Sequence, residues 1–327
     1  MVGRIVVSRL GGPEVLAWSE VEVGAPGPQD VRLRHTAIGV NFIDVYFRTG
    51  LYPAGSVPFA LGMEAAGVVD AVGADVTALK VGDRVAYASG PLGSYSEARL
   101  MPAERIVLLP PGIDDKTGAA MMLKGMTAEY LLHRTYPVKR GDAILVHAAA
   151  GGVGRILCQW AKHLGATVIG TVGSDEKARL ATESGCDHPI LYTREDVAKR
   201  VREITGGAGV AVVYDSVGKD TFTASLDSLA PRGMLALYGQ SSGSVGPFDP
   251  QLLNQKGSLF LTRPSLIHYT GTRADLALSA SRLFSAVESG AVKIHIGQTY
   301  ALRDAARAHA DLEARKTTGS TVLLPAG

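Results

Sequence analysis

The sequence predicts an α/β protein with two domains, a β-rich domain followed by a domain built on a doubly wound parallel sheet. The chain has 327 residues, a length typical of two domains. Up to about residue 124, short alternating apolar and polar runs are separated by Gly and Pro. From about residue 125, strand-like and helix-like segments alternate, which is the pattern of parallel α/β sheets.

The β-rich domain is predicted from its strands and turns, taken in chain order. The N-terminal residues 1–9 alternate like a strand and lack the apolar core of a signal peptide. Residues 31–38 and 65–72 alternate in the same way, and turn clusters at 24–28 and 81–84 separate the runs. Short strands at this spacing indicate a barrel-like domain.

The second domain begins with a strand, a glycine-rich turn and a helix. Residues 144–146 are an apolar run typical of a buried strand, and a turn of small residues follows at 148–154. Apolar residues then recur at helical spacing at 156, 157, 160, 161 and 164. Aligned to G-x-G-x-x-G the turn has Ala149 in place of the first glycine, while Gly151 and Gly154 keep the second and third. Amide groups at such a helix start bind a dinucleotide pyrophosphate.

The rest of the chain continues the alternation and ends in a tail. The expected strands are residues 144–146, 167–171, 189–191, 210–214 and 234–238, with helices between them. The tail from about residue 265 holds a helix at 273–289, a second around 302–315, and a last strand at 320–324. This order predicts a parallel, doubly wound sheet.

Composition excludes several classes of protein. The net charge is +2, from 33 basic and 31 acidic residues, and no run of Lys or Arg indicates a nucleic-acid or membrane surface. No apolar stretch reaches the length of a membrane span. With two cysteines, Cys158 and Cys186, no disulfide framework is expected, and a reducing cytoplasm fits.

The end of the second predicted strand favours NADP over NAD. An NAD site usually has an acidic residue there, about 20 residues past the glycine turn, to bond the ribose 2′-hydroxyl. Here the strand ends in Val172, Gly173 and Ser174 without a carboxylate. Ser174 is predicted to bond a 2′-phosphate and Lys177 to neutralise it. The adjacent acids at 175 and 176 would oppose a phosphate if they pointed inward, or else form the solvated first turn of the next helix.

Residues 239–243, Gly-Gln-Ser-Ser-Gly, match the nucleophile elbow of α/β-hydrolases. That elbow requires a helix directly after the serine. Residues 244–250 contain two prolines and a glycine, which exclude an immediate helix. A cofactor-contacting loop at the end of a sheet strand is therefore the preferred interpretation.

At this point a colinear set of motifs resembles a known family. The stretches are residues 11–16, 38–46, 48–53, 62–69, 81–85, 123–128, 147–154, 213–218 and 255–259. They resemble the medium-chain dehydrogenase/reductase superfamily, and within it the NADPH-dependent quinone oxidoreductases of the zeta-crystallin-like branch. The resemblance implies a GroES-like β-barrel domain at 1–124, a Rossmann NADP-binding domain at 125–264 and a return to the first domain at 265–327.

The resemblance also implies the cofactor contacts. NADPH is the expected cofactor, and Tyr192 resembles the family residue that lines the 2′-phosphate pocket. The full set of expected cofactor-binding residues is Asn41, Thr127, Ala150, Gly151, Gly152, Val153, Gly173, Ser174, Lys177, Tyr192, Ser216, Gly239 and Ser241.

The sequence departs from the zinc-dependent members of the superfamily. Asn41 stands near the expected Cys ligand, and Met63 replaces the His of the Gly-His-Glu motif. A structural zinc lobe would need four cysteines, and the histidines show no ligand spacing. We therefore expect no metal site and no metal-polarised alcohol chemistry.

The chemistry that remains is hydride transfer to an acceptor activated by its own electronics, such as a quinone or an α,β-unsaturated carbonyl. Asn41, Tyr46 and Tyr52 lie on segments that resemble the family's active-site wall, and Arg263 is expected near the nicotinamide. Asn41 would bond the acceptor, and the tyrosines would offer flat faces and a hydroxyl for a developing oxyanion. The alternatives are ordinary core tyrosines and a salt-bridged interface arginine.

Two classes of function stay open on the sequence. The first is an NADPH-dependent reductase acting on quinones, or alternatively on enones or enoyl thioesters. The second is a non-catalytic NADPH-binding protein. The run at 257–264 is a β-prone edge segment in which Leu259, Phe260 and Leu261 carry no charge. Pairing with a second copy is the expected way to cover this edge, and the resemblance implies the same, since relatives commonly dimerise there. The alternative is an edge covered by the tail helix at 302–315. We expect a cytoplasmic homodimer with a small conjugated carbonyl substrate and no nucleic-acid or membrane partner.

Overall fold

The computed structural model describes residues 1–325 and divides the chain into two compact units. Unit 1 contains Met1–Met126, Thr270–Phe284 and the chain from Ile294 onward, so the chain returns to it at its end. Unit 2 contains Thr127–Tyr269 and Ser285–Lys293. The limits 1–124, 125–264 and 265–327 stay a prediction about domains, because compact packing alone does not show which segments fold independently.

Unit 1 is built on strands that pair antiparallel, except for β15 and β16, which pair parallel. Its strands are β1 (Val2–Val7), β2 (Leu16–Val21), β3 (Asp30–Val40), β4 (Phe59–Ala60), β5 (Glu64–Val72), β6 (Arg84–Ala88), β7 (Ala98–Pro102), β8 (Val107–Leu108), β15 (Ile296–Ala301) and β16 (Ser320–Leu324). Within residues 1–325 they form one small sheet in the order β2-β1-β4 and one larger sheet in the order β15-β16-β3-β5-β6-β8, with β7 also paired to β3. The last strand, β16, pairs antiparallel with β3 and so fastens the chain end to the N-terminal sheet.

Helical segments of unit 1 connect and cover these strands. They are the 3-10 turns η1 (Pro13–Val15), η2 (Ala103–Arg105) and η4 (Leu302–Asp304), and the helices α1 (Phe42–Thr49) and α10 (Ala305–Glu313). The core between the strands contains Leu33, Ile38, Tyr87 and Leu323, all buried. In α1, Asn41 is the N-cap and Gly50, with φ of 80°, is the left-handed C-cap, so the sequence itself sets both ends.

Unit 2 contains a parallel sheet with helices on both faces. Its strands are β9 (Ala143–Val146), β10 (Thr167–Val172), β11 (His188–Leu191), β12 (Val210–Asp215), β13 (Leu229–Leu237) and β14 (Phe260–Thr262). Within the described chain their order is β11-β10-β9-β12-β13-β14, and all neighbouring strands in this order are parallel. The order reverses between β9 and β12, which is the position where doubly wound folds bind ligands. The predicted fold class is therefore confirmed.

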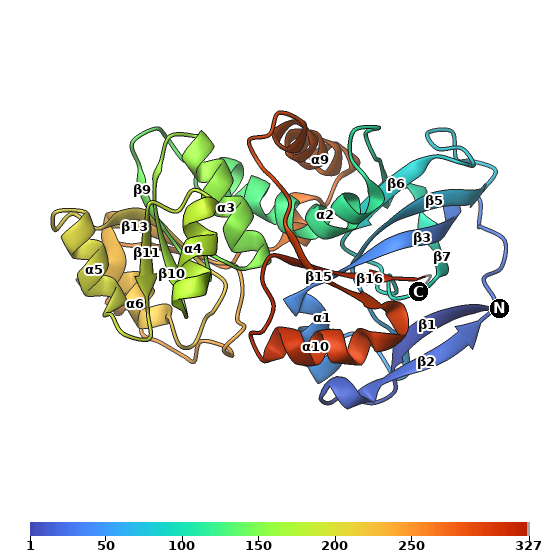
Figure 1. The fold of residues 1–327 in the computed structure, drawn as a ribbon, viewed down its shortest axis with the longest axis horizontal. Coiled ribbons are helices and arrows are strands. Elements are labelled where there is room, and N and C mark those ends of the chain that lie inside the picture. The colour runs from blue at the N-terminus through green and yellow to red at the C-terminus, as the bar shows by residue number, and fades with distance from the viewer. Residues whose placement is uncertain (326–327) are drawn as a thin grey trace. The chain divides into compact units, whose positions relative to one another are not determined.

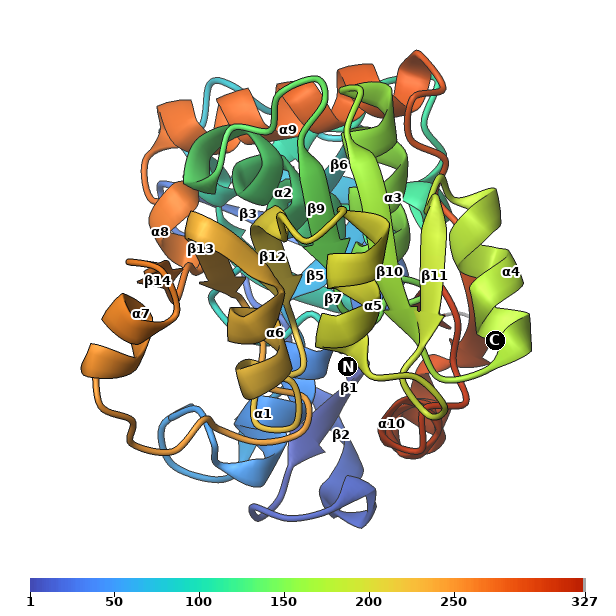
Figure 2. The ribbon, with the colours of Figure 1, turned by 90° about the vertical axis from the view of Figure 1, so that its left-hand side faces the viewer.

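The helices of unit 2 are α3 (Gly152–His163), α4 (Asp175–Glu183), α5 (Val197–Ile204), α6 (Phe222–Ser228), α7 (Gln251–Gln255) and α8 (Leu266–Tyr269), and a π-helical segment, η3, spans Leu131–Thr135. Helices α2 (Asp115–Tyr130) and α9 (Arg273–Glu288) each run from one unit into the other. Figures 1 and 2 show α3 and α4 on one face of the parallel sheet and α5 and α6 on the other. Apolar side chains between them, such as Leu145, Ile169 and Val213, form the core.

The predicted elements differ from the structure mainly at their ends. Strand β13 begins at Leu229 rather than Met234, with a register shift against β12. The segment expected as one helix at 302–315 is a 3-10 turn followed by α10. The edge run at 257–264 gives only three strand residues, since Gly257 and Ser258 both have positive φ. Such ends depend on turn geometry, which apolar periodicity does not report.

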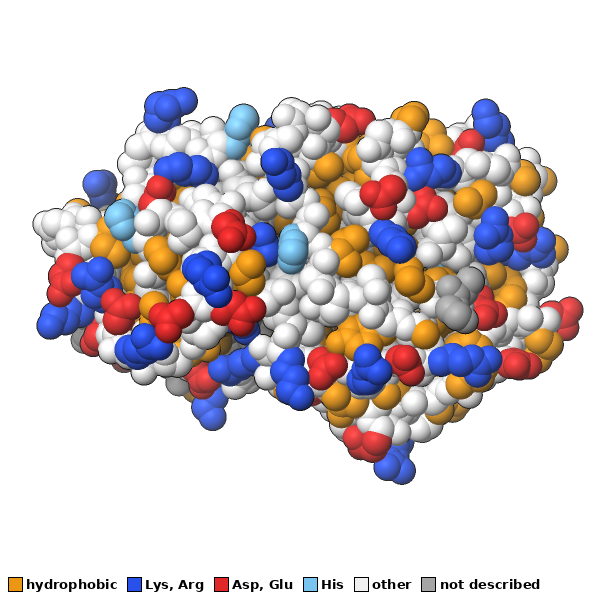
Figure 3. Space-filling view, in the orientation of Figure 1, with side chains coloured by type: hydrophobic (Ala, Val, Ile, Leu, Met, Phe, Trp, Pro, Cys, Tyr) orange, Lys and Arg blue, Asp and Glu red, His pale blue; other side chains and the backbone are white. Residues whose placement is uncertain are grey.

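Surface composition agrees with the near-neutral charge of the chain. On the face in Figure 3, Lys and Arg side chains are interspersed with Asp and Glu. Among residues 1–325, no helix combines the length and the apolar character that crossing a bilayer requires.

Candidate functional site

The glycine-rich turn of unit 2 is shaped to receive an anion. It connects β9 to α3, whose N-cap, Gly151, provides no side-chain hydrogen bond to the first helical N–H groups. A Cβ on Gly154 would lie 2.2 Å from the Ala148 carbonyl oxygen, so only glycine allows this tight turn. Because amide donors at the start of a helix are favourable partners for phosphate, the turn fits a dinucleotide pyrophosphate. Ala150, Gly152 and Val153 lie on this turn and the first turn of α3.

The segment after β10 contains the residues predicted to recognise a 2′-phosphate. Ser174 is the N-cap of α4, and its hydroxyl accepts the Lys177 N–H at 3.3 Å. Tyr192, after β11, covers Gly173 so closely that a Cβ there would be 2.7 Å from its hydroxyl. The predicted residues Gly173, Ser174 and Lys177 thus lie on the segment from the end of β10 to the first turn of α4, and Tyr192 packs against Gly173. It also places acids 175 and 176 in the first turn of α4, the second interpretation that the sequence allowed.

Asp175 pairs with a cation that the sequence analysis missed. The Arg194 guanidinium donates to the Asp175 carboxylate at 2.7 Å, and both side chains are well exposed. The pair neutralises the acid that had counted against a phosphate at this position. Arg194 stands 19 residues after Asp175 in the chain, a separation with no sequence signal.

Two neighbouring strand ends hold Ser216, Gly239 and Ser241. The Ser241 N–H donates to the Ser216 carbonyl at 3.1 Å, and a Cβ on Gly239 would lie 2.5 Å from the same oxygen. The loops after β12 and β13 are thus joined backbone to backbone at the carboxyl edge of the sheet. Residues 241–249 contain no helix, so the hydrolase elbow is absent, as the sequence analysis predicted.

A buried polar chain lies beneath these loops, and sequence analysis did not identify it. Thr171 Oγ1 and Ser225 Oγ lie 3.0 Å from the two ring nitrogens of His147, and Ser225 donates to the Asp215 carboxylate at 2.7 Å. Since Ser225 gives its proton to Asp215, His147 Nε2 is the donor to Ser225 and Nδ1 accepts from Thr171. Burial lowers the pKa of His147, which keeps the ring neutral for these roles. This series of hydrogen bonds fixes the carboxyl ends of β9, β10 and β12 relative to one another.

Two further predicted residues of unit 2 are placed separately. Thr127 is buried on α2 at the start of the unit. Arg263 follows β14, is exposed, and donates from its guanidinium to the Leu237 carbonyl at 3.0 Å. That contact attaches Arg263 to the end of β13, beside the loop that holds Gly239.

Unit 1 brings Asn41, Tyr46 and Tyr52 together around α1. The rings of Tyr46 and Tyr52 meet edge to face with centroids 5.2 Å apart, and the Tyr52 N–H donates to the Tyr46 carbonyl. Asn41 is buried at the start of the same helix, where its N–H donates to Asp44 Oδ2 at 2.8 Å. Its side-chain amide donates to Glu64 Oε2 at 2.7 Å. Tyr46 and Tyr52 thus form an aromatic pair, while the Asn41 side chain, at the start of α1, is bound to Glu64. We refer to these three residues and the groups bound to them as the α1 cluster.

Three charged residues of this cluster were missed by the sequence analysis. Glu64 is fully buried and accepts from Asn41, from the Leu123 N–H at 2.7 Å and from the Lys124 ammonium at 3.4 Å. Asp44 is also fully buried. Asp44, Glu64 and Lys124 each stand among apolar residues in the sequence, so nothing there indicated that the three charges would be buried together. Glu64 lies in the 62–69 motif and Lys124 in the 123–128 motif, but the motifs alone did not single them out.

Asp44 is the end of a directed hydrogen-bond chain. Arg48 lies 3.1 Å from His309 Nδ1, Tyr95 Oη lies 3.0 Å from His309 Nε2, and Tyr95 donates to Asp44 Oδ2 at 3.0 Å. A guanidinium only donates, so Nδ1 of His309 accepts and Nε2 carries the proton. Burial raises the pKa of Asp44 to about 7, with Lys124 opposing the rise and Glu64 adding to it. The chain ties α1 to α10 and fixes the helix that begins at Asn41.

The segments that hold zinc in metal-dependent relatives carry no metal-ligand group here. Met63 is buried, and Asn41 is engaged with Glu64. Over residues 1–325, no group of three or more His, Cys, Asp or Glu side chains is arranged to hold a metal ion.

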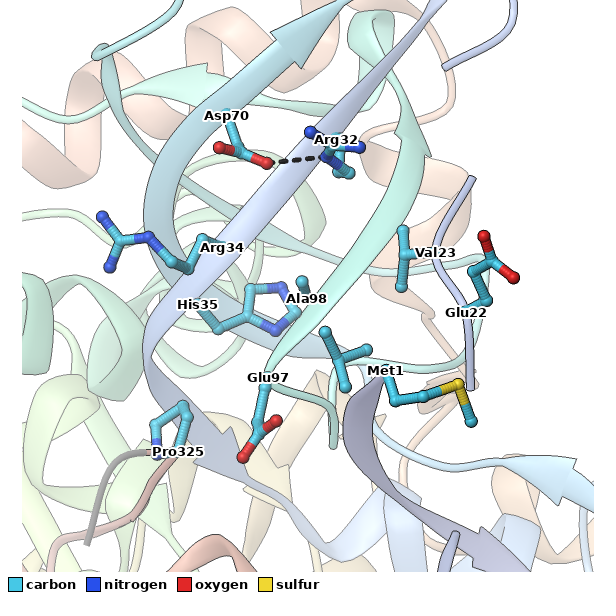
Figure 4. Close-up of a pocket in the computed structure, with 11 residues that line it drawn as sticks. Met1, Glu22, Val23, Arg32, Arg34, His35, Asp70, Glu97, Ala98 and Pro325 are labelled. Atoms are coloured by element: carbon cyan, nitrogen blue, oxygen red, sulfur yellow. Dashed lines mark hydrogen bonds and ion pairs between the residues drawn. The ribbon is translucent and has the colours of Figure 1, made fainter. Parts of the chain in front are cut away.

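A hollow of about 480 Å³ on unit 1 contains none of the predicted site residues. Figure 4 shows His35 inside it and the ion pair between Arg32 and Asp70 at its margin, at 2.6 Å. Both ring nitrogens of His35 are engaged, by the Ser96 carbonyl at 2.7 Å and the Tyr87 hydroxyl at 3.0 Å. The polar groups of the hollow are thus largely satisfied within the protein.

Comparison with known families divides the chain in two. Residues 27–138 match the alcohol dehydrogenase GroES-like domain family. Residues 152–281 match the zinc-binding dehydrogenase family, although this chain lacks the ligand pattern of that name.

Individual relatives match over nearly the whole chain. A quinone oxidoreductase of Pseudomonas aeruginosa is 55% identical, covering 99% of this chain and 100% of that protein. A 2-haloacrylate reductase of a Burkholderia species is 52% identical, covering 99% of each. The crystal structure of Escherichia coli quinone oxidoreductase complexed with NADPH superposes with a TM-score of 0.97 at 49% identity, covering 99% of this chain and 100% of that one.

Proposed function

Because this chain belongs to the quinone oxidoreductase family of medium-chain dehydrogenases/reductases, we propose that it is an NADPH-dependent quinone reductase. The observation that carries the proposal is the identity of 55% with a quinone oxidoreductase, over the full length of both chains. Most of the residues predicted for the cofactor lie on unit 2, and Asn41, Tyr46 and Tyr52, predicted for the acceptor, lie on unit 1. Bound NADPH would supply a hydride, and the protein would bind, orient and shield the acceptor.

The cofactor is proposed to bind along the carboxyl edge of the parallel sheet. The N-terminus of α3 would hold the pyrophosphate, while Ser174, Lys177, Tyr192 and Arg194 would hold the 2′-phosphate. Thr127, Ala150, Gly151, Gly152, Val153, Gly173, Ser216, Gly239 and Ser241 complete the proposed contacts. The NADPH in the E. coli relative supports this choice of cofactor.

The acceptor is proposed to bind at the cluster of unit 1. Tyr46 and Tyr52 would offer apolar ring faces to a planar quinone, and Asn41 a hydrogen bond to its oxygen or to the cofactor ribose. Arg263, anchored to the Leu237 carbonyl, would add a positive charge near the nicotinamide.

Oxidation of NADPH after addition of 1,4-benzoquinone tests the function directly. We expect a steady loss of absorbance at 340 nm that requires the protein and saturates with quinone. Tight NADPH binding without any acceptor-dependent oxidation would instead support the non-catalytic class that the sequence left open.

A second acceptor class follows from one comparison. The 2-haloacrylate reductase, 52% identical over 99% of each chain, reduces by its name a conjugated carbon–carbon double bond. Parallel assays with 2-chloroacrylate and an enone would decide between the acceptors through their kcat/KM values. A higher kcat/KM for the acrylate than for any quinone would replace the first proposal with this one.

Activity is expected to be independent of metal, because Asn41 and Met63 stand in the segments of the family's zinc ligands. Exhaustive chelation should leave quinone reduction within the error of an untreated sample. Stoichiometric zinc that is lost together with activity would contradict this expectation.

The remaining proposals concern assembly and location. We propose a homodimer formed through β14, since Phe260 is 57% exposed at the last strand of the sheet. We also propose a cytoplasmic location, since two buried free cysteines, Cys158 and Cys186, suit a reducing compartment.

A further inference from the structure

We propose that the Lys124 ammonium takes the place of the catalytic metal cation and binds the oxygen of the acceptor. This inference rests on the proposed reductase function and assigns the residue that stabilises the negative charge on the reduced acceptor. Zinc-dependent relatives provide that charge stabilisation with a metal ion. In this chain, the segments around Asn41 and Met63, which correspond to those of the zinc ligands, hold the ammonium group of Lys124 instead.

The position of the ammonium carries the argument. Lys124 Nζ donates to the Val40 carbonyl at 3.2 Å and to Glu64 Oε2 at 3.4 Å. Val40 directly precedes Asn41, and Glu64 directly follows Met63, the two positions that stand for zinc ligands in relatives. The positive charge therefore lies where these two segments meet, beside the amide of Asn41, which shares Glu64 Oε2.

The surroundings keep this charge fixed and dry. Lys124 is 6% exposed and Glu64 is fully buried. Glu64 accepts hydrogen bonds from the Asn41 amide, the Leu123 N–H and the Lys124 ammonium, so its carboxylate is held in place from three sides. Asp44, buried nearby, feels the same ammonium, which acts to lower its pKa. The charged groups facing Lys124 are thus carboxylates, from the β5 and α1 segments.

The ammonium has a hydrogen left for a ligand. It carries three N–H bonds, and Val40 and Glu64 account for two of them within the described chain. A carbonyl oxygen of a quinone or enone fits the third. Negative charge develops on that oxygen when hydride is added, and a fixed cation in a site shielded from water stabilises it more than the neutral Asn41 amide alone.

The competing explanation is that Lys124 only neutralises Glu64. A pair of variants separates the two, because Lys124→Met alone leaves a buried carboxylate without its counter-ion and can destabilise the fold. The double variant Lys124→Met/Glu64→Gln removes both charges at similar volume. Lys116→Met is the matched control, since Lys116 is exposed on the same helix, α2.

The test uses the full chain saturated with NADP⁺ and 4-nitrophenol as a mimic of the reduced acceptor. The absorbance of bound 4-nitrophenol reports whether it is held as the phenolate. We expect the wild type and Lys116→Met to hold the phenolate, and the folded double variant to lose it while NADP⁺ affinity stays within about twofold. Its kcat for quinone should fall about a hundredfold, as for loss of an oxyanion donor.

Two results would overturn the inference. One is a wild type that binds only neutral 4-nitrophenol, a measurement that does not depend on any variant. The other is a double variant with wild-type kcat and wild-type phenolate binding, which would make Lys124 a counter-ion alone. Failure of the proposed reductase function would give a different result. In that case the wild type would reduce no acceptor, although its binding of the phenolate would still depend on Lys124.

Discussion

At the residue scale, the charge balance around the proposed 2′-phosphate pocket depends on one ion pair. Asp175 and Glu176 precede Lys177, and as sequence they argue both for and against a phosphate. In the structure Arg194 pairs with Asp175 at 2.7 Å, while Ser174 caps α4. An exposed ion pair of this kind adds little stability. Its importance is that Arg194 neutralises Asp175 and brings a guanidinium group beside the proposed 2′-phosphate pocket.

The first residue-scale prediction concerns cofactor preference. Lys177→Ala and Arg194→Ala should each weaken NADPH binding about tenfold and leave NADH nearly unchanged, because only NADPH carries the 2′-phosphate. Fluorescence titration of each variant with both cofactors measures this. Arg200→Ala, an exposed arginine of α5 paired with Glu203, is the control and should change neither affinity. Equal wild-type affinities for NADPH and NADH would reject the assignment of the pocket.

The second concerns the acceptor cluster. Tyr52→Ala and Asn41→Ala should lower kcat/KM for quinone about tenfold or more, with NADPH affinity within a few-fold, since both residues belong to unit 1 whereas the glycine turn belongs to unit 2. Tyr52→Phe keeps the edge-to-face ring contact and separates the ring from the hydroxyl. Lost NADPH binding with unchanged quinone turnover at saturating cofactor would show that the roles are reversed.

At the scale of elements, the short strand β14 is the least protected part of the parallel sheet. It pairs with β13 through Phe260, Leu261 and Thr262, and within the described chain it ends the strand order. It carries no charge, and Phe260 is exposed. Such an edge favours pairing with another strand unless it is covered.

We predict that the protein is a homodimer formed through β14, and that one charged residue introduced on this strand dissociates it. Phe260→Lys should convert the dimer to a monomer near 34.2 kDa, since two lysines would meet across a two-fold axis. Leu261→Pro should act in the same direction through the backbone. Leu278→Lys, which changes an exposed leucine of α9, should leave the dimer intact. Light scattering at micromolar concentration measures all four proteins, and a monomeric wild type would refute the dimer.

At the scale of the whole molecule, buried histidines make stability depend on pH. Burial lowers the pKa of His35 to about 4 and that of His309 to about 3. Both rings are hydrogen-bonded in their neutral form. As the pH falls below 6.5, each of these histidines binds a proton in the unfolded chain but not in the folded chain, so the histidine's contribution to the free energy of unfolding decreases until its folded pKa is reached. The Asp44 carboxyl, whose pKa burial raises to about 7, acts in the opposite direction, but its shift is smaller than those of the two histidines together.

The prediction is a loss of stability between about pH 6.5 and pH 4. For His35 alone the linkage amounts to about 2 kcal/mol at pH 5 relative to pH 8. Urea unfolding of His35→Gln should show a smaller decrease between these two pH values than the wild type. His163→Gln, at an exposed histidine of α3, should show the wild-type dependence. An identical slope for His35→Gln would mean that His35 titrates normally.

Local patterns along the chain were enough to predict the fold class and the segments where chemistry could occur. Strand–turn–helix periodicity identified the parallel sheet, and the glycines at 151 and 154 identified the tight turn proposed to bind the pyrophosphate, because backbone sterics act locally. The motif around Asn41, Tyr46 and Tyr52 pointed to a segment where the two tyrosine rings meet and the Asn41 amide binds Glu64, and its role in acceptor binding stays a prediction.

Only the tertiary structure decided which charged groups stand beside those places. Lys124 meets Glu64 from 60 residues away, and Arg48 meets His309 from 261 residues away. Such contacts leave no periodic trace, because they depend on how strands and helices pack rather than on local conformation. Desolvation then sets the protonation of Asp44, His147 and His309, and burial is a property of the folded chain alone.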